Sequence, residues 1–126
     1  MSVWDAATTG AILGVLVSAV ACANTSQPAS NTQAELLKNW ALCRCLAKSD
    51  RSESARADAE KSAASYLEMG TAEIETYEKL ERLVDGFLQR TYSGSVASRY
   101  DTMKCIDLFR SAELQKMVEV AAAPPR

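Results

Sequence analysis

The segment "AEIETYEKLERLVDGFLQR", residues 72–90, carries the strongest structural signal in the chain. Its apolar residues recur three or four positions apart, which places them on one side of an α-helix and leaves the charged residues on the other. The pattern predicts an amphipathic helix that begins after Thr71, a suitable N-cap, and fades at Arg90. The predicted inner stripe consists of Ile74, Tyr77, Leu80, Val84, Phe87 and Leu88.

Two further helices are predicted before this segment, from shorter runs of the same spacing. The first covers Thr32–Lys48 and places Leu37, Ala41 and Cys45 on one stripe. The second covers Glu53–Met69, and its small residues would let another helix approach closely. Gly70 then suits a left-handed position just past the helix end.

Beyond the segment, the pattern returns after Asp101 and predicts a fourth helix whose inner stripe includes Met103 and Ile106. Ser111 stops this helix and caps a short final one, in which three apolar residues face inward: Leu114, Met117 and Val118. No run alternates as a strand should. The predicted fold class is all-α, a compact bundle of four to five helices around one core with one disulfide.

The composition excludes several classes of function. The chain contains no histidine, so it cannot build a Ser-His or Cys-His nucleophile pair or a zinc site that needs two or three histidines. Its net charge is −2 and no basic stripe is present, so nucleic acid is not an expected partner. We therefore expect a protein that is not an enzyme and that uses no cofactor or metal.

The N-terminal run "AILGVLVSAVACA", residues 11–23, resembles the apolar part of a signal peptide. It is too short to span a bilayer, and it ends in overlapping Ala-x-Ala sites of the kind that signal peptidase cuts. The preceding residues lack Lys and Arg, which leaves a native apolar helix and a lipoprotein at Cys22 as alternatives. The expected division is a signal peptide at 1–23, a flexible mature N-terminus at 24–33, a helical domain at 34–121 and a flexible tail at 122–126.

Export to the periplasm would expose the remaining cysteines to an oxidising compartment, where disulfides persist. Cys45 and Cys105 would form a bridge if their two helices pack together, and the alternative is a pair of buried free thiols. Cys43 would then remain unpaired. Cys43 and Cys45 are a weak metal signal, because one intervening residue turns their side chains about 200° apart on a helix.

The stretch "TYSGSVAS" separates the third and fourth predicted helices, and the connection from Thr91 to Tyr100 is longer than the usual 2–8 residues or so. It is either a plain connector or a binding loop in which tyrosine supplies contact area and Ser and Gly adapt their hydrogen bonds. Gly94 would allow a tight turn, with positive φ if needed. The candidate contact residues are Tyr92, Ser93, Gly94, Ser95, Val96 and Ser98. Glu75 and Glu78 offer either a secondary acidic contact for a basic partner or an ordinary solvated face.

Three blocks of the chain together resemble the family-four type VI secretion amidase immunity proteins. They are "KNWALCRCLAK", "DAEKSAASYLEMG" and "QRTYSGSVASRYDTMKCIDLFRSAEL", in this order. The resemblance covers about Leu37 to Val118, and the third block is the most specific. The sequence departs from the family pattern in its N-terminal region, which lacks Lys and Arg, and at Cys43, where a small residue is expected.

The resemblance implies a periplasmic inhibitor that protects the cell from a peptidoglycan amidase injected by sister cells. That amidase is a Cys-His peptidase of the NlpC/P60 type, and the inhibitors are helical homodimers that form a heterotetramer with the toxin. They cap the catalytic groove with the loop before the last major helix, which falls here on Tyr92–Ser98. The family's paired cysteines fall on Cys45 and Cys105. The alternative function is a periplasmic helical adaptor or chaperone with another protein partner.

The apolar run and its Ala-x-Ala sites predict that the mature protein starts near Cys22 or Asn24. Mass spectrometry of the protein purified from its native cells measures this start directly. A preparation in which most molecules keep Met1 would contradict both the export and the oxidising compartment inferred from it.

Overall fold

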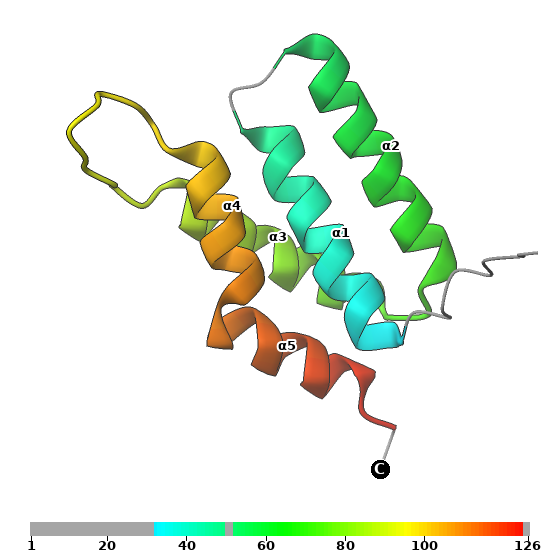
Figure 1. The fold of residues 1–126 in the computed structure, drawn as a ribbon. Helices are drawn as coiled ribbons and strands as arrows, with labels where there is room; N and C mark the ends of the chain where they lie inside the picture. The colour runs from blue at the N-terminus through cyan, green and yellow to red at the C-terminus, as the bar shows by residue number, and fades with distance from the viewer. Residues whose placement is uncertain (1–31, 50–51, 125–126) are drawn as a thin grey trace, which may run out of the picture.

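The computed structural model describes residues 32–49 and 52–124, which form five helices. These are α1 (Gln33–Lys48), α2 (Glu53–Met69), α3 (Ile74–Leu88), α4 (Asp101–Arg110) and α5 (Ala112–Ala122). α1 contacts all four of the others, whereas α2 contacts α1 alone among the described helices (Figure 1). No strand occurs in the described ranges, so the all-α prediction is confirmed. The predicted signal peptide lies outside the described residues.

The core forms where the apolar stripes of α1 and α3 meet the inner faces of α4 and α5. Its largest fully buried side chains are Leu37, Cys45, Leu80, Val84, Phe87, Cys105, Leu108, Leu114 and Val118. α2 adds only the small residues Ala59 and Ala63 to the buried set, which lets it lie close against α1. No helix within 32–49 and 52–124 is long and apolar enough to cross a membrane.

The predicted start of α3 is wrong by a few residues. Glu73, and not Thr71, occupies the N-cap position of α3. The backbone N–H and hydroxyl of Thr71 instead donate to Gln33 Oε1, at 3.0 and 3.2 Å, which joins the α2–α3 turn to the start of α1. Ile74 is therefore the first residue of the helix and is 63% exposed, so its predicted place on the inner stripe is wrong.

The predicted role of Gly70 is also corrected. It does follow α2, but its φ is −85°, so the position requires no left-handed backbone. The structure gives a steric reason for glycine instead, because a Cβ at this position would overlap the hydroxyl of Tyr77. Tyr77 is buried, and its ring packs edge-on against Trp40 with the centroids 5.0 Å apart.

α4 is rotated about its axis relative to the prediction. Met103 and Ile106, expected to face inward, are 51% and 47% exposed. The inner face carries instead Asp101, Lys104, Cys105 and Leu108. This face can be buried because the two charged residues form an ion pair and the cysteine is bonded to α1.

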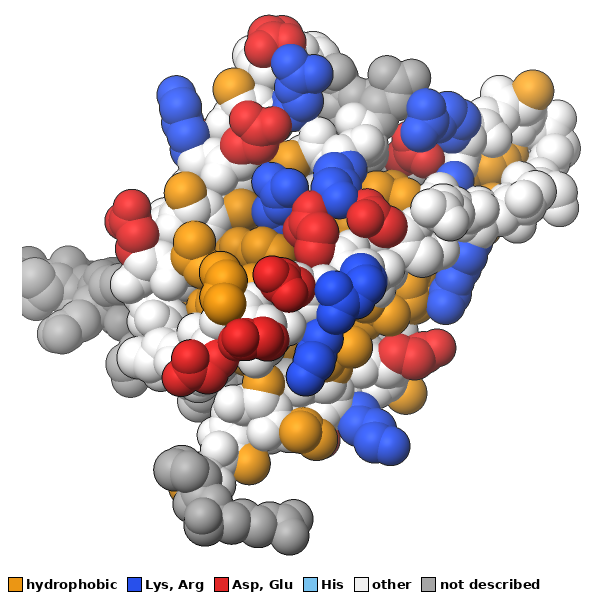
Figure 2. All heavy atoms as spheres, turned by 180° about the vertical axis from the view of Figure 1, so that it is seen from behind, with side chains coloured by type: hydrophobic (Ala, Val, Ile, Leu, Met, Phe, Trp, Pro, Cys, Tyr) orange, Lys and Arg blue, Asp and Glu red, His pale blue; other side chains and the backbone are white. Residues whose placement is uncertain are grey.

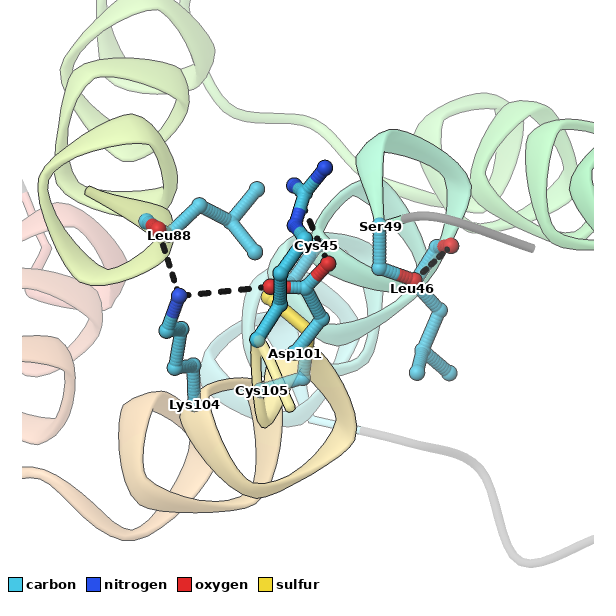
Figure 3. Close-up of a disulfide and its surroundings, with 8 residues drawn as sticks. Cys45, Leu46, Ser49, Leu88, Asp101, Lys104 and Cys105 are labelled. Atoms are coloured by element: carbon cyan, nitrogen blue, oxygen red, sulfur yellow. Dashed lines mark hydrogen bonds and ion pairs between the residues drawn. A yellow bond between two sulfur atoms is a disulfide. The ribbon is translucent and has the colours of Figure 1, made fainter. Parts of the chain in front are cut away.

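A disulfide joins Cys45 of α1 to Cys105 of α4, which confirms the predicted pair (Figure 3). Both residues are fully buried, with their Cα atoms 5.6 Å apart. Cys43 is a free, half-buried thiol, also as predicted, and burial raises its pKa, with a smaller contribution from Asp58. The raised pKa disfavours the reactive thiolate at Cys43.

Charged side chains connect α1 to α3 on the surface of the bundle. Arg44 and Lys48 contact Glu81 at 2.8 and 2.6 Å, and Lys48 also contacts Asp85 at 2.6 Å. Figure 2 shows basic and acidic side chains interleaved on this side of the molecule. Partial burial raises the pKa of the Glu81 carboxyl, but the hydrogen bonds from Arg44 and Lys48 outweigh it and hold that pKa below its ordinary value.

The disulfide closes a sequence separation of 60 residues. On the chain-entropy model, such a bridge stabilises a domain by about 4 kcal/mol. Replacing Cys45 and Cys105 with alanine should therefore lower the free energy of unfolding in urea by about 2–5 kcal/mol. Cys43→Ala serves as the control, since Cys43 forms no bridge. A double variant as stable as the wild type would contradict the account.

Candidate binding loop

The connection between α3 and α4, residues 89–100, projects away from the helices (yellow in Figure 1). Apart from Tyr92 and Tyr100, every residue in it is exposed. Figure 2 shows this projection at the upper right, covered mainly by uncharged side chains and backbone. The predicted long loop is thus present, and it stands clear of the body that carries it.

Most of the predicted contact residues lie together on the outer part of this loop. Ser93, Gly94, Ser95, Val96 and Ser98 are all exposed. Val96 has 70% of its surface exposed and is the largest apolar side chain in the segment. The loop tip therefore offers hydroxyl and backbone hydrogen-bonding groups around one apolar contact.

Tyr92 lies at the base of the loop, where it is bonded to the body. Its hydroxyl donates a hydrogen bond of 2.5 Å to Asp107 Oδ2 on α4. The Asp107 carboxylate raises the pKa of the Tyr92 hydroxyl, because the hydrogen bond favours the protonated phenol. This contact could not be predicted from local spacing, because the two residues lie 15 positions apart in the chain.

Tyr100 forms the other base of the loop and has a left-handed backbone, with φ 56° and ψ 32°. That conformation costs a residue with a side chain roughly 1–2 kcal/mol. Two hydrogen bonds accompany it: the Tyr100 hydroxyl donates to the carbonyl of Val96, and its N–H donates to Ser98 Oγ at 3.2 Å. The loop thus folds back on its own last residue before α4 begins.

Gly94 has a different role from the one predicted. Its φ is not positive, so the turn does not depend on a left-handed glycine. A Cβ at this position would overlap the hydroxyl and ring of Tyr100. The glycine is required for space, and any larger residue would have to displace the tyrosine that folds the loop back.

The ends of the loop meet at Lys104, which was not among the predicted site residues. Its ammonium donates to the carbonyl of Leu88 at 3.0 Å and lies 3.3 Å from Asp101 Oδ1 (Figure 3). Asp101 also pairs with Arg99, at 3.1 Å. A charged pair three residues apart beside Cys105 is the only sequence signal that could have indicated this arrangement.

The structure does not bring the candidate acidic contacts to the loop. Glu75 and Glu78 are exposed on the N-terminal half of α3, whereas the loop leaves its C-terminal end. At 1.5 Å per residue, they lie roughly 15–20 Å along the helix from Leu88. Within the described residues, no three His, Cys, Asp or Glu side chains are grouped so that they could hold a metal ion.

Comparison with known families gives a match over most of the helical region. The model of the Tai4 family, described as a type VI secretion system amidase immunity protein, matches residues 35–118. No curated protein sequence matches the chain significantly.

Solved structures also resemble the chain. A structure of the Tae4/Tai4 effector–immunity system from Salmonella typhimurium is 37% identical, with a TM-score of 0.67, covering 71% of this chain and 88% of that one. A structure from a study of type VI-secreted toxins and self-resistance proteins in Serratia marcescens is 31% identical, with a TM-score of 0.66 and coverages of 73% and 76%. A complex of the Salmonella typhimurium effector Tae4 with Tai4 from Enterobacter cloacae is 27% identical, with a TM-score of 0.62, covering 71% of this chain and 92% of that one.

The Tyr92–Asp107 hydrogen bond predicts a shift in tyrosine titration. Asp107→Asn removes the carboxylate that favours the protonated phenol, so the pKa of Tyr92 should fall toward its ordinary value. Absorbance of the phenolate during an alkaline titration measures this change. Tyr92→Phe identifies the contribution of Tyr92, and identical curves for the wild type and Asp107→Asn would contradict the contact.

Proposed function

The chain belongs to the family of type VI secretion amidase immunity proteins, and on that premise we propose that it inhibits its amidase by filling the catalytic cleft with residues 89–100. As a member of this family it provides immunity to an amidase effector and is not itself an enzyme. The proposal concerns how it inhibits and with which residues.

One observation carries the proposal: an exposed loop, uncharged from residue 91 to residue 98, projects from a body that fixes both of its ends. Occlusion requires shape and hydrogen-bonding groups, and it requires no reaction from the inhibitor. Val96 would enter the cleft, while Ser93, Ser95 and Ser98 bond to polar groups of its walls. Because the loop is already folded in the free protein, little conformational entropy is lost when it binds.

Tyr92 has a supporting part in this proposal. Its hydroxyl is already bonded to Asp107, so it cannot reach deep into a cleft without breaking that bond. The exposed part of its ring would widen the contact at the loop base. A groove beside Tyr100 is lined by Ser98, Met103 and Ile106. The exposed side chains of Met103 and Ile106 extend the proposed contact surface from the loop onto α4.

The location and the target are further parts of the proposal. We place the chain in the periplasm and residues 1–23 in a signal peptide, since the buried Cys45–Cys105 disulfide fits an oxidising compartment. The target amidase would be a Cys-His peptidase of the NlpC/P60 type that cuts the peptide stems of the cell wall. Cleavage of the cell wall would be blocked because the loop occupies the position of the substrate.

A second copy of the chain is the other proposed partner, giving a homodimer that binds two amidases as a heterotetramer. α2 packs on α1 alone and exposes Leu67 and Met69, close in sequence to the exposed Ile74 of α3. These apolar side chains support a contact with another protein surface. Glu75 and Glu78 would make a secondary contact that is separate from the loop.

The loop predicts a sharp loss of inhibition when it is replaced. A Gly/Ser linker in place of residues 92–98 should abolish inhibition of Salmonella typhimurium Tae4. Val96→Asp should weaken binding by about thirtyfold, because the new carboxylate would be buried without a partner at a cost of about 2 kcal/mol. Calorimetry measures the affinity, and circular dichroism confirms the helices.

Lys61→Ala is the control for these variants, since Lys61 is exposed on α2, away from the loop. It should leave the affinity unchanged. If the chain with the linker inhibits the amidase as well as the wild type does, residues 92–98 are a plain connector and the occlusion mechanism fails.

A further inference from the structure

We propose that Lys104 is a positioning residue for inhibition: its ammonium joins the two ends of the loop at residues 89–100 and keeps the loop ordered before the amidase arrives. Its effect on binding rests on the proposed function of the loop. The effect of Lys104 on the order of the loop is inferred from the contacts of Lys104 and does not depend on the proposed function.

The two contacts of Lys104 lie at opposite ends of the loop. Leu88, whose carbonyl accepts from the ammonium at 3.0 Å, is the last residue of α3. Asp101, whose carboxylate lies 3.3 Å from the same nitrogen, is the first residue of α4. Figure 3 shows the ammonium between these two partners. One side chain therefore fixes where the loop leaves the body and where it returns.

Both partners are chemically suited to a cation. The last carbonyls of a helix have no intrahelical donor and lie at the negative end of the helix dipole, so Leu88 O attracts the ammonium. Asp101 is the acidic residue in the first turn of α4, where the dipole favours negative charge. Lysine has several donors on one nitrogen, so it can serve the carbonyl and the carboxylate together.

The burial of this pair makes the arrangement specific. Lys104 and Asp101 are only 6% and 9% exposed, and lysine is almost never buried without a partner. If the end of α3 moved away from α4, the buried ammonium would lose its hydrogen bond to the Leu88 carbonyl, which is unfavourable for a buried donor. The neighbouring Cys105 is bonded to α1, so the helix that carries Lys104 is itself held in place.

The same ammonium also lies near the ring of Tyr92, 6.0 Å from its centroid. Tyr92 is thus a third group at the loop base that lies near this ammonium. Replacing Lys104 does not strand Asp101, because its carboxylate keeps the contact with Arg99 at 3.1 Å. A change at Lys104 can therefore test the position of the loop without leaving a buried carboxylate unpaired.

The experiment compares Lys104→Met, which keeps the aliphatic stem and removes the charge, with Lys104→Arg, which keeps the charge. Backbone ¹⁵N relaxation of the free protein gives order parameters for residues 91–99. We expect them to fall from near about 0.85 in the wild type to below about 0.6 in Lys104→Met, with α1 and α5 unchanged. Lys104→Arg should restore most of the order, and Lys61→Met, the same change at an exposed lysine, should change nothing.

Calorimetric titration with Salmonella typhimurium Tae4 gives the second measurement. Lys104→Met should bind about tenfold more weakly, because binding must then order the loop, and Lys104→Arg should recover most of the affinity. If Lys104→Met does not fold, Lys104→Gln, with a neutral donor, replaces it in both measurements.

The two measurements separate this inference from the proposed function. Unchanged order parameters in the folded Lys104 variant would overturn the positioning role, whatever the affinity. A variant with a disordered loop that still binds Tae4 as tightly as the wild type would support the positioning role of Lys104. It would contradict the proposal that the loop is the inhibitory element. A disordered loop with weakened binding would support both.

Discussion

The covalent bond between Cys45 and Cys105 is the constraint on which the rest of the structure depends. It fixes α4 against the central helix α1, and α4 in turn carries the residues that shape the loop. Lys104 bonds to the end of α3, Asp107 accepts from Tyr92, and Tyr100 turns the chain into the first residue of α4. If α4 were not fixed against α1, these three contacts would no longer hold the loop in one position relative to the helices.

This arrangement fits an inhibitor that acts by shape. The chain has no histidine, and the outer part of its projecting loop, residues 91–98, consists of uncharged residues. Such a loop must hold one conformation. Hydrogen bonds fix both of its ends to the helices, while its tip stays exposed. Two glycines show how closely this form is packed, since Gly70 and Gly94 each leave room for a tyrosine hydroxyl. In both cases glycine serves packing, with no demand for a left-handed backbone.

The sequence predicted the elements better than it predicted their contacts. The bounds of α2, the inner stripe of α3 from Tyr77 onward and the long loop follow from local spacing and residue type, and the structure has them. The Cys45–Cys105 disulfide, which is also present, was predicted from the expected oxidising compartment and the family resemblance. The orientation of α4 does not follow, because periodicity places Met103 and Ile106 inside and cannot foresee that Lys104 and Asp101 neutralise each other. The contacts of Tyr92 and Gly94 join residues whose proximity arises only in the folded chain.

The mode of inhibition distinguishes a loop that fills the catalytic cleft from one that binds elsewhere on the amidase. If the loop fills the catalytic cleft, the chain and the substrate cannot bind the amidase together. In steady-state hydrolysis of a soluble peptidoglycan stem peptide by Salmonella typhimurium Tae4, added chain should raise the apparent KM and leave kcat unchanged. A fall in kcat at constant KM, with substrate bound to the inhibited complex, would contradict occlusion and place the inhibitory contact outside the cleft.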